Sequence, residues 1–382
     1  MKRSFLGRAM NKAFAPINEK RQWWQLPTTS LKALNLLSQR LDLRDLNLYD
    51  VEGHELQTET SEQPPKEALT ARRPDGKWND LNDPEMGSTG TPFARNIDPK
   101  KYKPEKPPRL HEPSARTVSL ELMTRHEFLP ATNLNVLAAA WIQFENHNWF
   151  FHGRGKAEEI MDVPLAENDD WHEDPMHVRR TVPLPGGKDF GNTETHWWDA
   201  SQIYGTSVEQ QKGLRTFTDG KLKIGEDGRL LPDPDEPGLD LTGFNENFWF
   251  GLSCLHTLFT KEHNAICDVL KRENPGWSDQ RLFDTAWLVN SALMAKIHTV
   301  EWTPGIVNTP ALWLAMNTNW SGLLGQHIKD RFGRIGDSEL FSGIMGSPQE
   351  HHGARFQLTE EFVSVYRMHP LIRDDWNFFS HE

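Results

Sequence analysis

Hydrophobic and polar positions follow a helical period over much of the chain, most clearly in residues 136–149, "VLAAAWIQFENHNW". Positions i, i+4, i+7 and i+11 of this stretch share one helical face, and they are Val136, Ala140, Gln143 and His147. The face begins apolar and ends polar, which indicates a helix whose last turns line a pocket. A lone buried histidine is more often only hydrogen-bonded within a core, so other parts of the chain must decide between these interpretations.

The same period predicts two long helices and a short one nearer the C-terminus. The long helices cover residues 249–273 and 278–302, with Ser278 as the N-cap of the second and Pro304 as its stop. The short helix begins after its N-cap, Thr359. Because the chain has no βαβ alternation and no internal repeat, the sequence predicts a mainly α fold.

Three further stretches complete this picture. Residues 1–60 also have helical periodicity, whereas residues 61–115 are rich in proline, glycine and charge and predict an irregular arm wrapped over a domain. Residues 217–233, "FTDGKLKIGEDGRLLPD", contain two Asp-Gly pairs and predict a small β-hairpin.

Composition excludes some classes of protein. The 382 residues are 37% hydrophobic, with 15 Trp and 20 Phe, which is enough for a large core. A net charge of −12 without a basic stripe argues against a nucleic-acid partner. The two cysteines, Cys254 and Cys267, are spaced too widely for a CxxC pair, and we expect both to be buried thiols on helices.

The N-terminal "MKRSFLGRAMNKAFAP" lacks the apolar stretch of a signal peptide, and no run approaches the roughly 18 apolar residues of a membrane span. We therefore expect a cytoplasmic protein. The amphipathic segment 31–50 gives it a possible peripheral membrane contact, although packing within the protein is the favoured interpretation.

In "VYRMHPL", Tyr366 precedes His369 by three residues, about one turn, near the end of a helix that closes at Pro370. A histidine just before proline can turn its ring toward a ligand, and the tyrosine would then lie beside whatever that ring binds. A surface helix end explains the pattern about as well.

Two other stretches carry polar groups at suggestive spacing. In "THWWDASQIYG", Thr195, Asp199 and Ser201 alternate around Trp197, and oxygens on alternate residues suit a hard cation such as calcium. An Asx-type turn is the alternative.

In "AKIHTVEWTP", His298 and Thr303 could hold an anionic head group, and Glu301 could help to keep His298 protonated. A capping pair without a ligand is the alternative for this stretch.

Together these stretches resemble one family from about residue 20 onward. In order they are "WWQLP", "PDGKWNDLNDPEMGSTGTPFARNI", "AAAWIQFENHNWFFHG", "THWWDASQIYGTS", "RTFTDGKLKI", "LFTKEHNAICDVLK", "AKIHTVEWT", "NWSGLLG" and "LTEEFVSVYRMHPL". The chain is similar to the animal-type haem peroxidase and cyclooxygenase superfamily, and within it most similar to the fatty-acid α-dioxygenases. The resemblance implies a helical haem peroxidase domain over residues 116–382, preceded by a helical segment and an irregular arm over residues 1–115.

The resemblance also assigns roles in binding haem b and oxidising a substrate. By this resemblance His147 corresponds to the distal histidine of the family, with Gln143 as its partner. A neutral imidazole at that place can move the proton of a bound peroxide. His369 becomes the proximal iron ligand. Tyr366 becomes the radical that takes hydrogen from the α carbon of a fatty acid before O₂ adds. His298 and Thr303 become the groups that hold the carboxylate of that fatty acid.

Three departures from the family qualify these roles. Thr195, the Trp197 carbonyl, Asp199 and Ser201 correspond to a calcium loop, but its remaining ligand, usually Asp, is Asn148, so calcium should bind weakly or not at all. Residues 242–249 lack the distal arginine of other peroxidases.

The third departure is length. The sequence ends 13 residues after His369, whereas the family continues. We expect the acceptor for the proximal histidine, the rest of the acyl channel and an arginine of the carboxylate site to be missing.

Three hypotheses therefore stand, led by a haem-dependent fatty-acid α-dioxygenase that uses fatty acid and O₂. The alternative is a haem peroxidase that reduces peroxide with small organic donors. A truncated, non-catalytic member of the family is the third. A non-haem metal hydrolase is disfavoured because the sequence has no HExxH motif.

Overall fold

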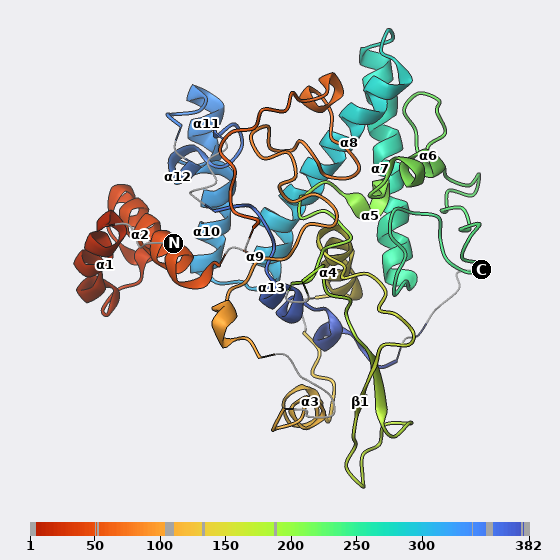
Figure 1. Ribbon diagram of the computed structural model, residues 1–382. Coiled ribbons are helices and arrows are strands. Elements are labelled where there is room, and N and C mark those ends of the chain that lie inside the picture. Colours follow the sequence, from red (N-terminus) through yellow and green to blue (C-terminus); the bar gives the residue numbers. More distant parts are fainter. Residues whose placement is uncertain are drawn as a thin grey trace.

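The computed structural model describes residues 5–49, 51, 53–103, 111–131, 134–186, 189–337, 339–348, 354–375 and 377. Residues 104–110 of the predicted arm lie outside this set. Helices dominate the described part, and Figure 1 shows the long α7 and α8 beside each other, the α1–α2 pair on the opposite side and the β-hairpin projecting away from the body. The mainly α prediction is confirmed.

The helices of the first half are α1 (Phe5–Asn18), α2 (Thr29–Asn47), α3 (Ala115–Val118), α4 (Val136–Trp149), α5 (Ser201–Tyr204) and α6 (Val208–Leu214). Those of the second half are α7 (Phe250–Glu273), α8 (Asp279–Lys296), α9 (Thr303–Ile306), α10 (Pro310–Ser321), α11 (Gln326–Phe332), α12 (Glu339–Ser342) and α13 (Glu360–Val365). Short 3₁₀ turns occupy Trp23–Gln25, Lys66–Leu69, Pro99–Lys101 and His369–Leu371, and π-helical turns occupy Ser119–Met123 and Ile297–Trp302.

The main core lies where α4 packs on α7 and α7 packs on α8. The start of α4 is determined locally, because the Asn135 side chain accepts a hydrogen bond from the Leu137 amide and so caps the helix. Phe144 of α4 stacks on Phe259 of α7 at 5.4 Å, and Trp287 of α8 is also buried in this cluster. The polar end of α4 is thereby held beside a rigid helix pair.

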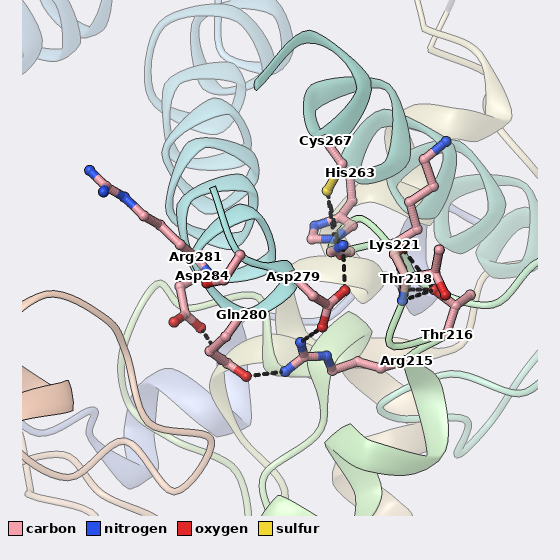
Figure 2. Close-up of polar contacts among 12 residues, drawn as sticks. Arg215, Thr216, Thr218, Lys221, His263, Cys267, Asp279, Gln280, Arg281 and Asp284 are labelled. Atoms are coloured by element: carbon pink, nitrogen blue, oxygen red, sulfur yellow. Dashed lines mark hydrogen bonds and ion pairs between the residues drawn. The ribbon is translucent and has the colours of Figure 1, made fainter. Parts of the chain in front are cut away.

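A polar cluster ties the loop after α6 to the start of α8 (Figure 2). The buried Arg215 guanidinium donates to Asp279 and to Gln280, each at 2.7 Å, and the Gly220 amide donates to Asp279 at 2.6 Å. Because Asp279 lies in the first turn of α8, its carboxylate also complements the positive end of that helix dipole.

This tether replaces the hairpin predicted for residues 217–233, and that prediction is wrong. Residues 215–240 contain only isolated bridges, Arg215 with Leu222 and Pro232 with Asp240. Phe217 and Asp219 have left-handed φ angles of 57° and 53°, which bend the chain too sharply for a paired strand.

A hairpin does occur at a place where none was predicted. Strands β1 (Ile160–Val163) and β2 (Met176–Arg179) pair antiparallel, with Ile160 opposite Arg179. His177 contacts Asp162 across the pair at 2.7 Å. The strands escaped prediction because each is only four residues long and most of their residues are exposed or only partly buried.

The predicted irregular arm runs along the C-terminal segment of the described chain. Ala94 bridges Thr359, and Arg95 pairs with Glu361 at 2.6 Å. Arg355 donates to the fully buried Asp83 at 2.9 Å, which fixes the arm to the segment before α13. The arm therefore holds α13 in place.

Two helix ends differ from the prediction. Pro304 does not stop the second long helix, because the chain continues through a π-helical turn into α9, whose first turn contains this proline. The short helix begins after Thr359 as predicted but ends at Val365, so Tyr366 caps α13 and His369 opens a separate 3₁₀ turn.

The two cysteines do not share one environment. Cys267 is buried, and Cys254 is exposed, so the expectation of two buried thiols is wrong for Cys254. It lies on the outward side of α7, which the α4 and α8 contacts leave uncovered.

The amphipathic segment from Leu31 is α2, and it packs against α1. It still exposes Leu31, Leu34, Leu43 and Leu46. None of the helices among the described residues combines the length and apolar character needed to cross a bilayer.

Candidate active site

His147 and His369 line the same cavity, although they are more than 200 positions apart in the sequence. His147 comes from the last turn of α4 and His369 from the 3₁₀ turn after α13. The cavity has a volume of about 590 Å³. Its walls include Gln143, the rings of Phe150, Phe151 and Phe244, and the side chains of Arg367 and Arg373.

Gln143 is fixed at this cavity by the loop before α7. Its Oε1 accepts a hydrogen bond from the Trp249 indole at 2.7 Å, and its Nε2 donates to the Asn247 carbonyl at 3.2 Å. His147 is buried beside Phe244, and burial lowers the pKa of its imidazole to about 3. A neutral imidazole next to a fixed amide can accept and return a proton.

Tyr366 lies against His298, a contact that joins α13 to the segment after α8. The two side chains meet with Tyr366 Oη 3.1 Å from His298 Nε2. Asn146 of α4 donates to the Tyr366 carbonyl at 2.7 Å, and Phe362 stacks on the phenol ring at 4.8 Å. Burial raises the pKa of Tyr366, and nearby Glu145 adds to the rise, so the hydroxyl keeps its proton.

His298 is enclosed by four indoles, those of Trp141, Trp149, Trp198 and Trp302. Trp302 stacks on the imidazole at 4.9 Å, and the Trp141 indole donates to Nδ1 at 3.1 Å. Burial lowers the pKa of His298 to about 4, so the imidazole is neutral.

The expectation that Glu301 keeps His298 protonated is wrong. Glu301 is exposed and pairs with Lys296 at 2.9 Å, so its charge is directed to solvent and not to the imidazole.

Thr303 and His298 are brought together by the π-helical turn Ile297–Trp302. Both the amide and the hydroxyl of Thr303 donate to the His298 carbonyl, the hydroxyl at 2.7 Å. A hydrogen bond from an amide N–H to the carbonyl five residues earlier defines a π-helix. This geometry aligns residues that an α-helix would place on different faces. The two residues therefore lie close together, and their role in holding an anionic head group remains a prediction.

The five residues of the suspected calcium loop also lie together, but they bind one another. Thr195 donates to Asp199 at 2.5 Å, and Ser201 donates to the Asn148 carbonyl at 3.0 Å. The Asn148 amide donates to the Trp197 carbonyl at 3.3 Å. An N–H directed at a carbonyl occupies the position that a cation would need, so this arrangement does not fit calcium well. The calcium site remains a prediction.

Replacing Asn148 with aspartate is expected to create a calcium site. The change adds a charge and removes the N–H that faces the Trp197 carbonyl. Millimolar calcium should then raise the melting temperature of the Asn148→Asp chain and leave the parent unchanged, and about 2.7 kcal/mol is expected at a hundredfold excess over Kd. Adding Thr195→Val should cancel the gain. Equal stabilisation of the parent chain would show that the asparagine loop already binds calcium.

The face of α4 opposite Gln143 and His147 also reaches the site, although its sequence pattern did not predict this. Trp141, Glu145 and Trp149 follow one another at i, i+4 and i+8, so they form one stripe. The two indoles contact His298, and Glu145 interacts electrostatically with Tyr366. Burial raises the pKa of Glu145 to about 8. The spacing was visible in the sequence, but nothing local said what the stripe would face.

Comparisons with known proteins agree with this fold. Residues 71–382 match the animal haem peroxidase family, so the chain belongs to that family. It is 40% identical over 361 residues to the rice alpha-dioxygenase PIOX, covering 93% of this chain and 57% of the relative. It is 27% identical over 291 residues to mouse prostaglandin G/H synthase 1, covering 71% of this chain and 38% of the relative.

Solved structures give the same result. A crystal structure of a tyrosine-to-phenylalanine variant of rice fatty acid alpha-dioxygenase with palmitic acid superposes with a TM-score of 0.84 at 36% identity, covering 97% of this chain and 60% of that one. The Arabidopsis thaliana fatty acid alpha-dioxygenase also gives 0.84, at 35% identity, covering 97% and 57%. The chain thus spans little more than half the length of the alpha-dioxygenases it matches.

Proposed function

We propose that this chain forms the haem-binding and radical-forming part of a fatty-acid α-dioxygenase. One observation carries the proposal: Tyr366 contacts His298 at 3.1 Å and lies three residues before His369, which lines one cavity with His147. A redox-active phenol is thereby held between a cofactor cavity and a group able to bind an acid. The names of the alpha-dioxygenase relatives support the same activity.

The residues around the cavity fit haem b. Two imidazoles from distant elements, His147 and His369, reach one space whose walls include the rings of Phe150, Phe151, Phe244 and Trp249. The guanidinium groups of Arg367 and Arg373 at the same cavity suit the two carboxylates of this group. His369 would be the iron ligand and His147 the distal base. When bound, haem supplies the one-electron oxidant that the protein lacks.

Tyr366 would do the chemistry on the substrate. Once it has lost an electron and a proton, its phenoxyl oxygen takes a hydrogen atom from the α carbon of the fatty acid, so a C–H bond breaks and an O–H bond forms. O₂ then adds to the carbon radical. The resulting peroxyl takes the hydrogen atom back from Tyr366, which leaves a 2-hydroperoxy acid and restores the tyrosyl radical.

His298 and Thr303 would bind the carboxylate and so set the position of attack. Anchoring the acid beside Tyr366 brings the adjacent carbon, and no mid-chain carbon, to the phenol oxygen. Thr303 would turn its hydroxyl from the His298 carbonyl to the acid. A second cavity, of about 660 Å³, offers apolar walls to an acyl chain, among them Phe128, Leu134, Val136 and Leu371.

Haem reconstitution followed by oxygen uptake tests the proposal. The purified chain is expected to develop a Soret band with haem and then to consume O₂ when palmitic acid is added. Replacing His369 with alanine should abolish the native spectrum, whereas the same change at His327, an exposed residue of α11, should not.

Two outcomes would contradict the proposal. Turnover of hydrogen peroxide with a phenolic donor that greatly exceeds O₂ uptake would favour the peroxidase alternative, since His147 and Gln143 could serve both activities. A chain without a Soret band would be the non-catalytic member of the family.

A further inference from the structure

His298 has both ring nitrogens in use, and the two contacts are not equivalent. The Trp141 indole lies 3.1 Å from Nδ1, and Tyr366 Oη lies 3.1 Å from Nε2. An indole N–H can only donate, so Nδ1 must present its lone pair to Trp141. A neutral imidazole with a lone pair on Nδ1 carries its proton on Nε2. The hydrogen bond to Tyr366 therefore runs from His298 Nε2–H to the phenol oxygen.

The surroundings of His298 keep it in this neutral form. Trp149 and Trp198 present their rings at 5.2 Å and 5.3 Å, and Trp302 stacks at 4.9 Å. The ring is 7% exposed, and the nearest acid in the sequence, Glu301, is paired with Lys296. With no counter-charge at either nitrogen, the tautomer alone decides whether His298 donates or accepts toward Tyr366.

We propose that Trp141 is a positioning residue that fixes His298 as a hydrogen-bond donor through Nε2. The same N–H would then serve Tyr366 in the free protein and the fatty-acid carboxylate when substrate is bound. This inference rests on the proposed function, because it concerns the site where that function places the acid.

The tautomer matters because the reverse one would oppose both roles. With its proton on Nδ1, His298 would turn a lone pair toward the anionic carboxylate and would repel it. It would also accept the hydroxyl proton of Tyr366. In the donor form, Nε2–H stabilises the negative charge of a bound carboxylate, and in the free protein the hydroxyl hydrogen of Tyr366 is directed away from His298.

A single N–H also links substrate binding to the state of Tyr366. A carboxylate that takes the Nε2–H removes it from the phenol oxygen, so the tyrosine loses its donor when substrate arrives. A tyrosyl radical formed with fatty acid present should therefore give the EPR spectrum of a radical without a hydrogen-bond donor. Without fatty acid, the spectrum should be that of a hydrogen-bonded radical.

The direct test is nitrogen NMR of the chain labelled with ¹⁵N-histidine, without haem or fatty acid. Loss of signals in a His298→Gln chain assigns the two nitrogens. The parent is expected to carry its proton on Nε2. Trp141→Phe should move the proton partly or wholly to Nδ1. Trp149→Phe is the matched control, because Trp149 contacts the same ring from the same helix without a hydrogen bond to it.

A kinetic readout follows on the haem-loaded chain. Trp141→Phe should raise the KM for palmitic acid by about ten- to a hundredfold, the range expected for losing a hydrogen bond to a charged group, with a smaller change in kcat. Trp149→Phe alters the packing on the same ring and removes no hydrogen bond to it, so its KM should rise less than that of Trp141→Phe. If Trp141→Phe does not fold, 3-benzothienylalanine at position 141 keeps the shape of the indole and removes its N–H.

The proposal is overturned if the parent carries the proton on Nδ1, or if loss of the Trp141 N–H leaves the proton on Nε2 unchanged. These results are independent of oxygen uptake. A parent chain that binds haem but consumes no O₂ would refute the proposed function, while the tautomer would still decide the role of Trp141.

Discussion

A chain in which phenylalanine replaces Tyr366 is expected to bind haem as the parent does and to lose its palmitic-acid-dependent O₂ uptake. The loss should be on the order of a thousandfold, as for other groups whose own bonds form and break in the reaction. Phenylalanine keeps the ring that stacks on Phe362 at 4.8 Å, so the fold of α13 should be unaffected. Only the O–H bond, the source of the radical, is removed.

The buried Tyr204 supplies the control for this experiment. Its hydroxyl contacts His263 and Asn290, each at 2.9 Å, within the core of α5, α7 and α8. Tyr204→Phe should therefore lower the melting temperature, because it breaks buried hydrogen bonds, and should leave O₂ uptake per bound haem unchanged. Substantial uptake by the Tyr366→Phe chain would exclude a radical at this residue and with it the proposed mechanism.

Sequence periodicity was sufficient to predict the long helices because their signals are local. The N-caps Ser278 and Thr359 each accept a hydrogen bond from an amide three residues later, and the apolar faces of α4 and α7 repeat with the helical period. The failures are also physical. Asp279 at the start of α8 holds the loop at residues 217–233 by accepting a hydrogen bond from the Gly220 amide, and no property of the loop sequence reveals a tether so far along the chain.

The site also has a part that local sequence predicts and a part that depends on contacts between distant segments. Gln143 and His147 share a face that could be seen in one helix, and the cavity confirms that this face lines a pocket. The contact between Trp141 and His298 spans 157 positions, and that between Tyr366 and His298 spans 68. Such pairs depend on how helices dock, which one sequence does not encode locally. The neutral state of His298 was missed for this reason, because it results from packing and not from its sequence neighbours.

Glu145 is another residue whose state results from packing, and the effect on stability can be measured. It lies in the polar half of α4 but is 1% exposed, its Oε1 has no hydrogen-bond partner among the described residues, and burial alone raises its pKa to about 8. In the unfolded chain this carboxyl should lose its proton near the ordinary glutamate pKa of about 4.3. The folded chain therefore holds a proton that the unfolded chain loses between these two pH values.

The sign of the effect follows from that difference. Below about pH 4 both states are protonated, and Glu145 adds no pH dependence. From there to about pH 8 the unfolded state binds fewer protons than the folded state, so stability falls as pH rises, by about 1.4 kcal/mol for each pH unit. Glutamine at this position does not titrate. Glu145→Gln should therefore become more stable relative to the parent as pH rises, by about 3 kcal/mol between pH 5 and pH 7.

Thermal or urea unfolding of both chains from pH 5 to pH 8 measures this difference. Because Glu194, whose pKa is also raised to about 8 by burial, is present in both chains, its contribution cancels. Glu226→Gln, at an exposed glutamate, should give a flat difference over the same range. A flat difference for Glu145→Gln would mean that Glu145 is solvated or paired in solution. An uncharged Glu145 also places no negative charge of its own beside Tyr366, where the proposed function puts the fatty-acid carboxylate.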